Sequence, residues 1–340
     1  MFDQTSLTFL AFVIIIALVF ELSNGFNDAA NAIATVVSTR VMSPLTAVLM
    51  AATMNFLGAV SGTAVAKTVG KGVVDPTILT GGDGLLAVAG GTAAAAVWVF
   101  TATRFGMPVS GSHSLIAGVA GAGIAHSGWG VLVADGITKI ARGLVFSPIL
   151  GFLGGYLIML GIYWAFRAAT PAVVSAVFGK AQMATAAAMA FSHGSNDAQK
   201  TMGIITLALA VFYDWEGQGI PFEVPWWVIV VSAVTMGIGT YLGGRRVIHT
   251  LGVRIVTMRP PHGFAAEGAA ASVIELATRS GIPVSTTHVI TSAILGMGST
   301  RRLSAVRWGV AREIVFAWVL TFPVVSLLGA AGFYLFRLAS

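Results

Sequence analysis

Long stretches of the chain carry no charged residue. Five such runs span residues 41–66, 85–103, 146–166, 225–244 and 314–336. An α-helix needs about 20 mostly apolar residues to cross the hydrocarbon core of a bilayer. These runs are continuous, whereas the strands of a membrane barrel alternate between apolar and polar residues. The pattern therefore predicts an all-α, polytopic membrane protein.

The composition supports that class. Of the 340 residues, 56% are hydrophobic and 9% are charged, whereas soluble proteins carry about 25% charged residues. The net charge is +6, but the basic residues lie mainly between the hydrophobic runs, where they set the orientation in the membrane. We therefore expect a lipid bilayer and no nucleic acid as partner. The absence of cysteine excludes disulfides and thiolate metal sites.

Two motifs occur twice, in the same order, half a chain apart. The segment Asn27–Asn31 (NDAAN) has its counterpart at Asn196–Lys200 (NDAQK), an offset of 169 positions (196 − 27). The segment Pro108–His113 (PVSGSH) has its counterpart at Pro283–His288 (PVSTTH), an offset of 175 (283 − 108). Internal repetition of this kind indicates a duplicated architecture.

The duplication divides the chain into a first transmembrane repeat, 1–167, and a second, 168–340. The loop around Arg40 is basic, whereas its counterpart in the second half, residues 213–227, has three acids and no base. Because Lys and Arg concentrate in cytoplasmic loops, these equivalent loops are predicted to face opposite sides. The two halves are therefore expected to be inverted-topology repeats.

Each half is expected to contain two irregular features. Its first long segment, 8–39 or 180–212, includes a Gly, Asn and Asp cluster. Such residues are poor helix formers, so we expect broken first helices. The apolar stretch after each Pro-Val-Ser tip is only about 12–14 residues long, which is too short to cross a bilayer and predicts re-entrant helical hairpins.

Asp28 and Asp197 stand at equivalent positions inside hydrophobic segments. A carboxylate at the centre of a membrane helix costs about 2.5–3.5 kcal/mol, so two of them at equivalent positions are expected to have a function. With Asn27 and Asn196 beside them, they are expected to form an oxygen cage for a coupling cation, either as Na⁺ ligands or as an H⁺ site. The alternative is that each motif caps an ordinary turn.

The two Pro-Val-Ser tips offer a different chemistry. A helix N-terminus combines backbone N–H groups with a positive dipole, which suits oxyanions such as phosphate or sulfate. The alternative is helix capping without a ligand. The candidate anion-binding residues at the tips are Ser110, Gly111, Ser112, Ser285, Thr286 and Thr287.

Other polar residues in the hydrophobic segments are further candidates. Gln199 and Lys200 are expected to join the anion site, and Lys200 could instead pair with an aspartate or reach an interface. His193 is a candidate proton carrier, although a structural role competes with it. Glu267 lies close enough to the second tip to reach the cavity. Glu21, about two turns before Asp28, is a structural partner or a second acidic site.

The repeated motifs resemble those of the inorganic phosphate transporter (PiT) family. The matching segments are 24–35, 191–203, 106–113 and 281–288, and the sequence SHGSNDAQK is more similar to bacterial members than to animal ones. The resemblance implies an inverted-repeat fold with a central anion site. It also implies secondary transport coupled to Na⁺ or H⁺, with the Asn-Asp pairs binding the coupling ion and the hairpin tips binding phosphate.

One position departs from the family pattern. Asn55 stands where animal members carry a glutamate, whereas the repeat-related glutamate is matched by Glu267. From this resemblance we expect Glu267 to act with the coupling cation, and we expect a multi-pass protein of the plasma (inner) membrane without a cofactor. A homodimer is left open by the sequence.

Several functions compete with phosphate symport by alternating access. Some bacterial relatives are similar to sulfate permeases, so a sulfate symporter of the same fold remains an alternative. An anion channel is disfavoured by the two carboxylate-bearing segments. An enzyme is not expected, because the sequence has no His-Glu-x-x-His, Gly-x-Ser-x-Gly or Walker motif.

Overall fold

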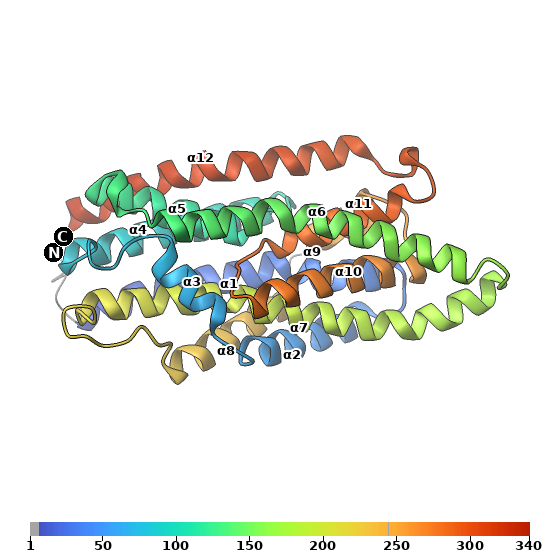
Figure 1. The fold of residues 1–340 in the computed structure, drawn as a ribbon, viewed down its shortest axis with the longest axis horizontal. Helices are drawn as coiled ribbons and strands as arrows, with labels where there is room; N and C mark the ends of the chain where they lie inside the picture. The colour runs from blue at the N-terminus through green and yellow to red at the C-terminus, as the bar shows by residue number, and fades with distance from the viewer. Residues whose placement is uncertain (1–6, 244) are drawn as a thin grey trace.

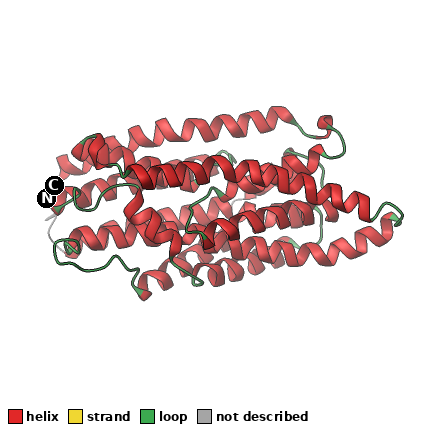
Figure 2. Ribbon diagram, in the orientation of Figure 1, coloured by secondary structure: helices red, strands yellow, loops and turns green. Residues whose placement is uncertain are grey.

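The protein is almost entirely helical, as the hydrophobic pattern predicts (Figure 2). The structure is a computed structural model and describes residues 7–340 except residue 244. Its α-helices are α1 (Leu7–Ser38), α2 (Pro44–Ala59), α3 (Ala64–Gly72), α4 (Gly81–Arg104), α5 (Gly111–Ser127), α6 (Ala134–Ala165), α7 (Pro171–Phe212), α8 (Trp226–Leu242), α9 (Arg245–His249), α10 (Pro260–Arg279), α11 (Thr286–Ser299) and α12 (Trp308–Ala339). The long helices lie along one axis (Figure 1).

The helix lengths confirm a multi-pass membrane protein. In the part of the chain that the structure describes, α1, α4, α6, α7 and α12 are each long and apolar enough to cross a bilayer. Two bent pairs raise the number to as many as seven if each pair is one crossing: α2 with α3, bent by 71°, and α8 with residues 246–254, bent by 66°.

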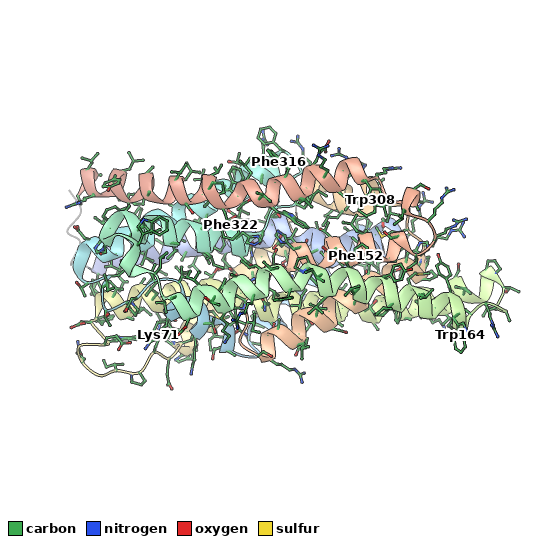
Figure 3. All side chains as sticks on the ribbon, turned by 45° about the horizontal axis from the view of Figure 1, so that its top comes forward. Lys71, Phe152, Trp164, Trp308, Phe316 and Phe322 are labelled. Carbon is green, nitrogen blue, oxygen red and sulfur yellow. The ribbon has the colours of Figure 1, made fainter. Side chains whose placement is uncertain are left out.

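Large apolar side chains cover the outside of the bundle. Phe316 on α12 is 66% exposed and Trp164 on α6 is 72% exposed, and both point away from the helices (Figure 3). An exposed apolar surface on this scale is typical of helices that face lipid, and aromatic residues near helix ends are typical of the membrane interface.

The two motif tips join pairs of helices into hairpins. α4 and α5 form one hairpin, α10 and α11 form the other, and they enter the bundle from opposite ends (Figure 1). Each hairpin turns at a glycine with positive φ, 71° at Gly106 and 62° at Gly281. Glycine adopts this conformation without strain. The tips meet inside the bundle, where the Ser112 hydroxyl donates to the Val284 carbonyl at 2.9 Å.

The prediction of broken first helices is wrong. α1 and α7 each run without interruption through the Asn-Asp motif. Asn and Asp weaken helices because their side chains compete for the backbone, but here the side chains bond to other helices. Asn27 Nδ2 donates to Thr103 Oγ1 at 2.6 Å, and Asn196 Nδ2 donates to Thr278 Oγ1 at 2.8 Å. Tertiary hydrogen bonds therefore override the local preference.

α2 and α7 cross at a pair of glycines. A Cβ added to Gly194 would lie 2.1 Å from the Asn55 carbonyl oxygen, and one added to Gly58 would lie 2.0 Å from the Phe191 carbonyl oxygen. The two backbones therefore approach as closely as small residues allow. This crossing holds Asn55 next to His193 on α7.

The Gly194→Ala variant is expected to be less stable by about 1–3 kcal/mol, because the added methyl group must push two packed backbones apart. The measurement is the thermal unfolding midpoint of the purified protein in detergent. Gly179→Ala is the matched control on the same helix, since nothing lies within 4 Å of a Cβ at that position. Equal midpoints for the two variants would contradict the close crossing.

Candidate functional site

Asp28 and Asp197 meet at the centre of the bundle. α1 and α7 pack against each other and run in opposite directions (Figure 1), which brings together two residues 169 positions apart. Asp28 is 1% exposed and Asp197 is 2% exposed. The imidazole of His193 lies between them, with Nε2 3.6 Å from Asp28 Oδ2 and 3.4 Å from Asp197 Oδ2.

A chain of hydrogen bonds sets the orientation of that imidazole. The Thr240 hydroxyl donates to the Met236 carbonyl, so its oxygen accepts from Asn55 Nδ2 at 2.9 Å. Asn55 Oδ1 then faces His193 Nδ1 at 2.9 Å. Because an amide oxygen only accepts, Nδ1 is the donor. When the imidazole is neutral, Nε2 therefore presents its lone pair to the two carboxylates, and when it is protonated Nε2–H faces them as a donor.

With a neutral imidazole, the Nε2 lone pair of His193 and one oxygen of each aspartate thus converge as three acceptor atoms. Asp28 Oδ2 and His193 Nε2 have no hydrogen-bond partner among the described residues, and one ligand atom each from Asp28, His193 and Asp197 lies within 4.8 Å of the others. Converging acceptors in a buried site repel one another unless a positive charge lies among them. A proton or a metal cation bound there would satisfy all three, so the geometry is that of a cation site.

Lys200 connects the carboxylates to the hairpin tips. Its ammonium group forms a short ion pair with Asp197, donates to the Ser112 hydroxyl and donates to the Val284 carbonyl at 2.7 Å. It does not reach an interface, because it is 2% exposed.

Two hydroxyl groups of the second tip also bond to the aspartates. Thr287 Oγ1 donates to Asp28 Oδ1 at 3.0 Å, and Thr286 Oγ1 donates to Asp197 Oδ2 at 3.1 Å. Asn31 Nδ2 reaches Thr287 Oγ1 at 3.0 Å. We call Asp28, His193, Asp197, Lys200, Ser112, Thr286 and Thr287 the central site.

The capping interpretation applies to the first serine of each tip. Ser110 Oγ accepts from His113 N at 3.1 Å, and Ser285 Oγ accepts from His288 N at 3.3 Å. These hydroxyls complete the N-termini of α5 and α11. Gly111 is buried against Asn24, where a Cβ would lie 1.8 Å from the Asn24 side-chain oxygen.

Gln199 is one of the candidate residues that lie outside the central site. We expect Gln199 at the anion site; in this structure its Oε1 accepts from Val65 N at the start of α3 at 2.7 Å, and its Nε2 donates to Ser195 O within α7 at 2.7 Å. The reason is the helical rotation of about 100° per residue, which turns Gln199 away from the face of Lys200.

Glu267 forms a separate polar cluster between α1, α7 and α10. It is fully buried, and its carboxylate accepts from the Thr35 hydroxyl, from Gln182 Nε2 at 3.2 Å and from Thr185 Oγ1 at 2.8 Å. The carboxylate of Glu267 is thus satisfied by three neutral donors away from the central site.

Some residues that contact the central site or the motif asparagines carried no role in the sequence prediction. Asn31 and Asn55 are the main ones, and Thr103 and Thr278 hold the two motif asparagines. Asn31 and Lys200 each lie one helical turn after a motif asparagine, and residues four apart share a helix face. That spacing was the available signal for Asn31, whereas the sequence has no comparable signal for Asn55.

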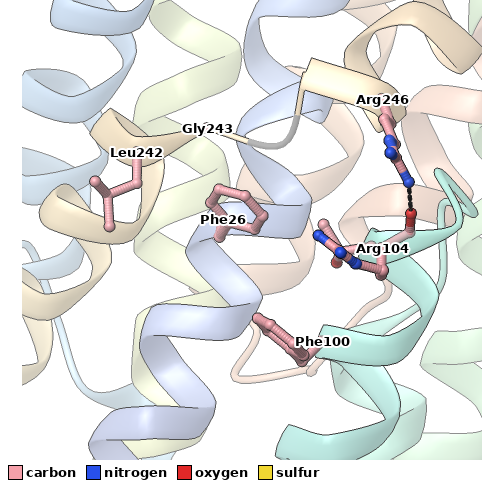
Figure 4. A pocket seen from close by; sticks show the side chains of 7 residues that line it. Phe26, Phe100, Arg104, Leu242, Gly243 and Arg246 are labelled. Carbon is pink, nitrogen blue, oxygen red and sulfur yellow. Dashed lines mark hydrogen bonds between the residues drawn. The ribbon is translucent and has the colours of Figure 1, made fainter.

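A pocket of about 440 Å³ opens beside the tip of the first hairpin. It is lined by Phe26, Phe100, Arg104, Leu242, Gly243 and Arg246, and Arg246 donates to the Arg104 carbonyl oxygen (Figure 4). Thr103, which accepts from Asn27, also lines it. The pocket therefore has two arginines in its wall and touches the threonine that holds the first motif asparagine.

A helical membrane bundle with buried carboxylates and a lysine between two hairpin tips defines a membrane transport protein. The model of the phosphate transporter family matches residues 24–329, and the chain belongs to that family. It is a transporter and not an enzyme.

Similar proteins and a solved structure agree with this family. A probable low-affinity inorganic phosphate transporter of Rhizobium meliloti (strain 1021) is 43% identical over 323 residues, covering 95% of each chain. A protein of Bacillus subtilis (strain 168) with the same description is 40% identical over 326 residues, covering 96% of each. The solved structure described as "the sodium-dependent phosphate transporter" superposes with a TM-score of 0.85 at 26% identity, covering 98% of this chain and 100% of the other.

Proposed function

We propose that the protein is a cation-coupled symporter that carries inorganic phosphate across the plasma membrane by alternating access. The observation that carries the proposal is the central site, where converging acceptors for a cation lie directly against donors for an anion. The solved neighbour is described as a sodium-dependent phosphate transporter, which supports the same combination of substrates.

Coupling follows from competition for the same donors. In this structure Lys200, Thr286 and Thr287 bond to the two aspartates. A cation bound between the carboxylates would replace these donors and release them for phosphate. Each ligand would then bind more tightly in the presence of the other, as thermodynamic linkage requires. With Na⁺ as coupling ion, Asp28 and Asp197 would be ligands; with H⁺, His193 would carry the proton between them.

The acceptor atoms favour phosphate over sulfate. Asp28 Oδ2 is a buried acceptor without a donor among the described residues, and a carboxylate has enough lone pairs to bind a cation and also accept a hydrogen bond. Monohydrogen phosphate has a hydroxyl proton that it can donate there, whereas sulfate has none. A site built to accept a hydrogen bond discriminates strongly against a ligand that lacks the donor. The anion is therefore proposed to be HPO₄²⁻.

Matched contacts support the inverted-repeat organisation. Asn27 and Asn196 bond to equivalent threonines on α4 and α10, and their amides lie at the same distance, 3.4 Å, from the carbonyls of Met107 and Ile282 in the two tips. α6 ends at Ala165 and α7 begins at Pro171, which is consistent with repeats spanning 1–167 and 168–340. Alternating access would come from these halves rocking about the central site.

Glu267 is proposed to bind a coupling cation at a position separate from the central site. Thr35, one of its donors, lies seven residues after Asp28 on α1, which is about 10 Å along the helix. A buried carboxylate held only by neutral groups retains a negative charge that a passing cation can neutralise.

Uptake of radiolabelled phosphate into proteoliposomes containing the purified full-length chain tests the proposal. Inward Na⁺ and H⁺ gradients are imposed separately, and one of them is expected to drive accumulation against the phosphate gradient. A tenfold excess of sulfate is far below the discrimination of about 10⁴-fold or more that a missing hydrogen bond gives at such a site, so it is expected to leave uptake unchanged. Flux that ignores both gradients would indicate a channel, and full competition by sulfate would indicate the sulfate symporter.

A further inference from the structure

Glu21 is a buried carboxylate that the central site does not use. It is 0% exposed on α1. The Thr201 hydroxyl of α7 donates to its Oε2, and its Oε1 has no hydrogen-bond partner among the described residues. None of the ion pairs in the described part of the chain involves Glu21. A carboxylate with one neutral donor and one unpartnered oxygen is costly to bury, so packing alone does not account for it.

The equivalent position in the other half shows that the fold does not need a polar pair here. The motif offset of 169 relates Glu21 to Ala190 and Thr201 to Ala32 (190 − 21 and 201 − 32). Both alanines are fully buried and belong to one apolar cluster. At equivalent positions of α1 and α7, the chain therefore has two alanines on one side of the central site and a hydrogen-bonded glutamate and threonine on the other.

The position of Glu21 along α1 relates it to the other carboxylates. Glu21 lies seven residues before Asp28, and Thr35, which donates to Glu267, lies seven residues after it. At 1.5 Å per residue each interval is about 10 Å. Measured along α1, carboxylates thus occur at three levels: Glu21 of α1, the two aspartates of the central site, and Glu267 of α10, which bonds to Thr35. The titratable groups whose fields reach Glu21 are Asp197, His193 and Lys200, all on α7.

We propose that Glu21 and Thr201 form an additional binding position for the coupling cation, Na⁺ or H⁺, on the side of the central site nearer the N-terminus of α1. The inference rests on the proposed symport. The unpartnered Oε1 supplies the negative charge and the Thr201 hydroxyl oxygen a neutral ligand. A cation held there is one step of about 10 Å from Asp28, so the position serves as a relay between the adjacent membrane face and the central site.

The test is the cation dependence of phosphate uptake in proteoliposomes, measured for Glu21→Gln with Na⁺ and pH varied in separate series. The isosteric amide keeps the hydrogen bond with Thr201 but removes the charge. The cation concentration for half-maximal uptake is expected to rise at least about tenfold, in line with loss of a charged partner, and the steepness of the cation response is expected to fall. If the half-maximal concentration changes in the Na⁺ series, the ion bound at Glu21 is Na⁺; if it changes in the pH series, the ion is H⁺.

Two further variants make the result decisive. Thr201→Val removes the neutral ligand without changing charge and is expected to shift the same curve in the same direction by a smaller factor. Glu275→Gln is the matched control, because Glu275 pairs with Arg279 near the C-terminal end of α10, with Arg279 Nε 2.9 Å from Glu275 Oε1. The cation dependence of uptake by Glu275→Gln should equal that of the parent protein. If Glu21→Gln is not produced in folded form, Thr201→Val alone gives the measurement.

The outcomes separate this inference from the proposed function. Cation-driven uptake by the parent protein with an unchanged cation dependence in Glu21→Gln and Thr201→Val would overturn the role of Glu21 and leave symport intact. A parent protein whose phosphate flux does not respond to either cation would overturn the proposed symport, and the inference with it.

Discussion

Asp28→Asn is expected to abolish cation-driven phosphate uptake. The substitution keeps the shape of the side chain but removes one of two negative charges that face the cation position. At about 4 Å and an effective dielectric constant of about 20, one charge pair is worth about 4 kcal/mol, which corresponds to about a thousandfold loss of cation affinity. The measurement is gradient-driven uptake in proteoliposomes at several cation concentrations.

The control for this prediction is Asp135→Asn, the same chemical change in the first turn of α6, where the side chain is exposed. It should transport at the rate of the parent protein. Because Asp28 accepts from Thr287, gel filtration should also establish that Asp28→Asn remains folded. Normal coupled uptake by a folded Asp28→Asn protein would refute the assignment of the central site.

Lys200→Gln is expected to lose phosphate binding as well as uptake. The substitution removes the ammonium group that contacts both tips, through the Ser112 hydroxyl and the Val284 carbonyl. It also leaves the buried carboxylate of Asp197 without its cationic partner, and breaking a buried ion pair costs about 3–5 kcal/mol. The affinity for phosphate, measured by calorimetry in detergent at saturating cation, should fall by at least about a hundredfold.

Lys180→Gln is the matched control, since Lys180 is exposed on the same helix. Its phosphate affinity should be unchanged. A Lys200→Gln protein that binds phosphate normally but fails to transport it would restrict Lys200 to the pairing with Asp197 and exclude it from the anion site. The comparison thus distinguishes anion binding from charge compensation.

The repeat was the most informative feature of the sequence. It predicted that Asp28 and Asp197 are equivalent, and the antiparallel packing of α1 and α7 places them together with His193 between them. The motif tips were located correctly because proline, glycine and serine mark turns and helix starts by local chemistry, as the positive φ values of Gly106 and Gly281 demonstrate.

The incorrect prediction of broken first helices has a cause in the tertiary structure. Local propensity suggested a break at each Asn-Asp motif, but Thr103 and Thr278 on other helices accept the hydrogen bonds of the motif asparagines. The assignment of Gln199 to the anion site stays a prediction, and in this structure the side chain bonds to Val65 and Ser195. Asn55 was recognised only as a departure from the resemblance, and its contact with His193 depends on the crossing of α2 and α7.

The sequence by itself determined the membrane class, the repeated motifs and the few polar residues placed within hydrophobic segments, because hydrophobic run length, internal similarity and turn chemistry are local properties of the chain. Only the tertiary structure decided which of those residues share a site. The donors and acceptors of Asp28, Asp197, Lys200 and Glu21 come from helices far apart in sequence. The packing of the helices determines which of these residues become hydrogen-bond partners, and no local sequence pattern encodes that packing.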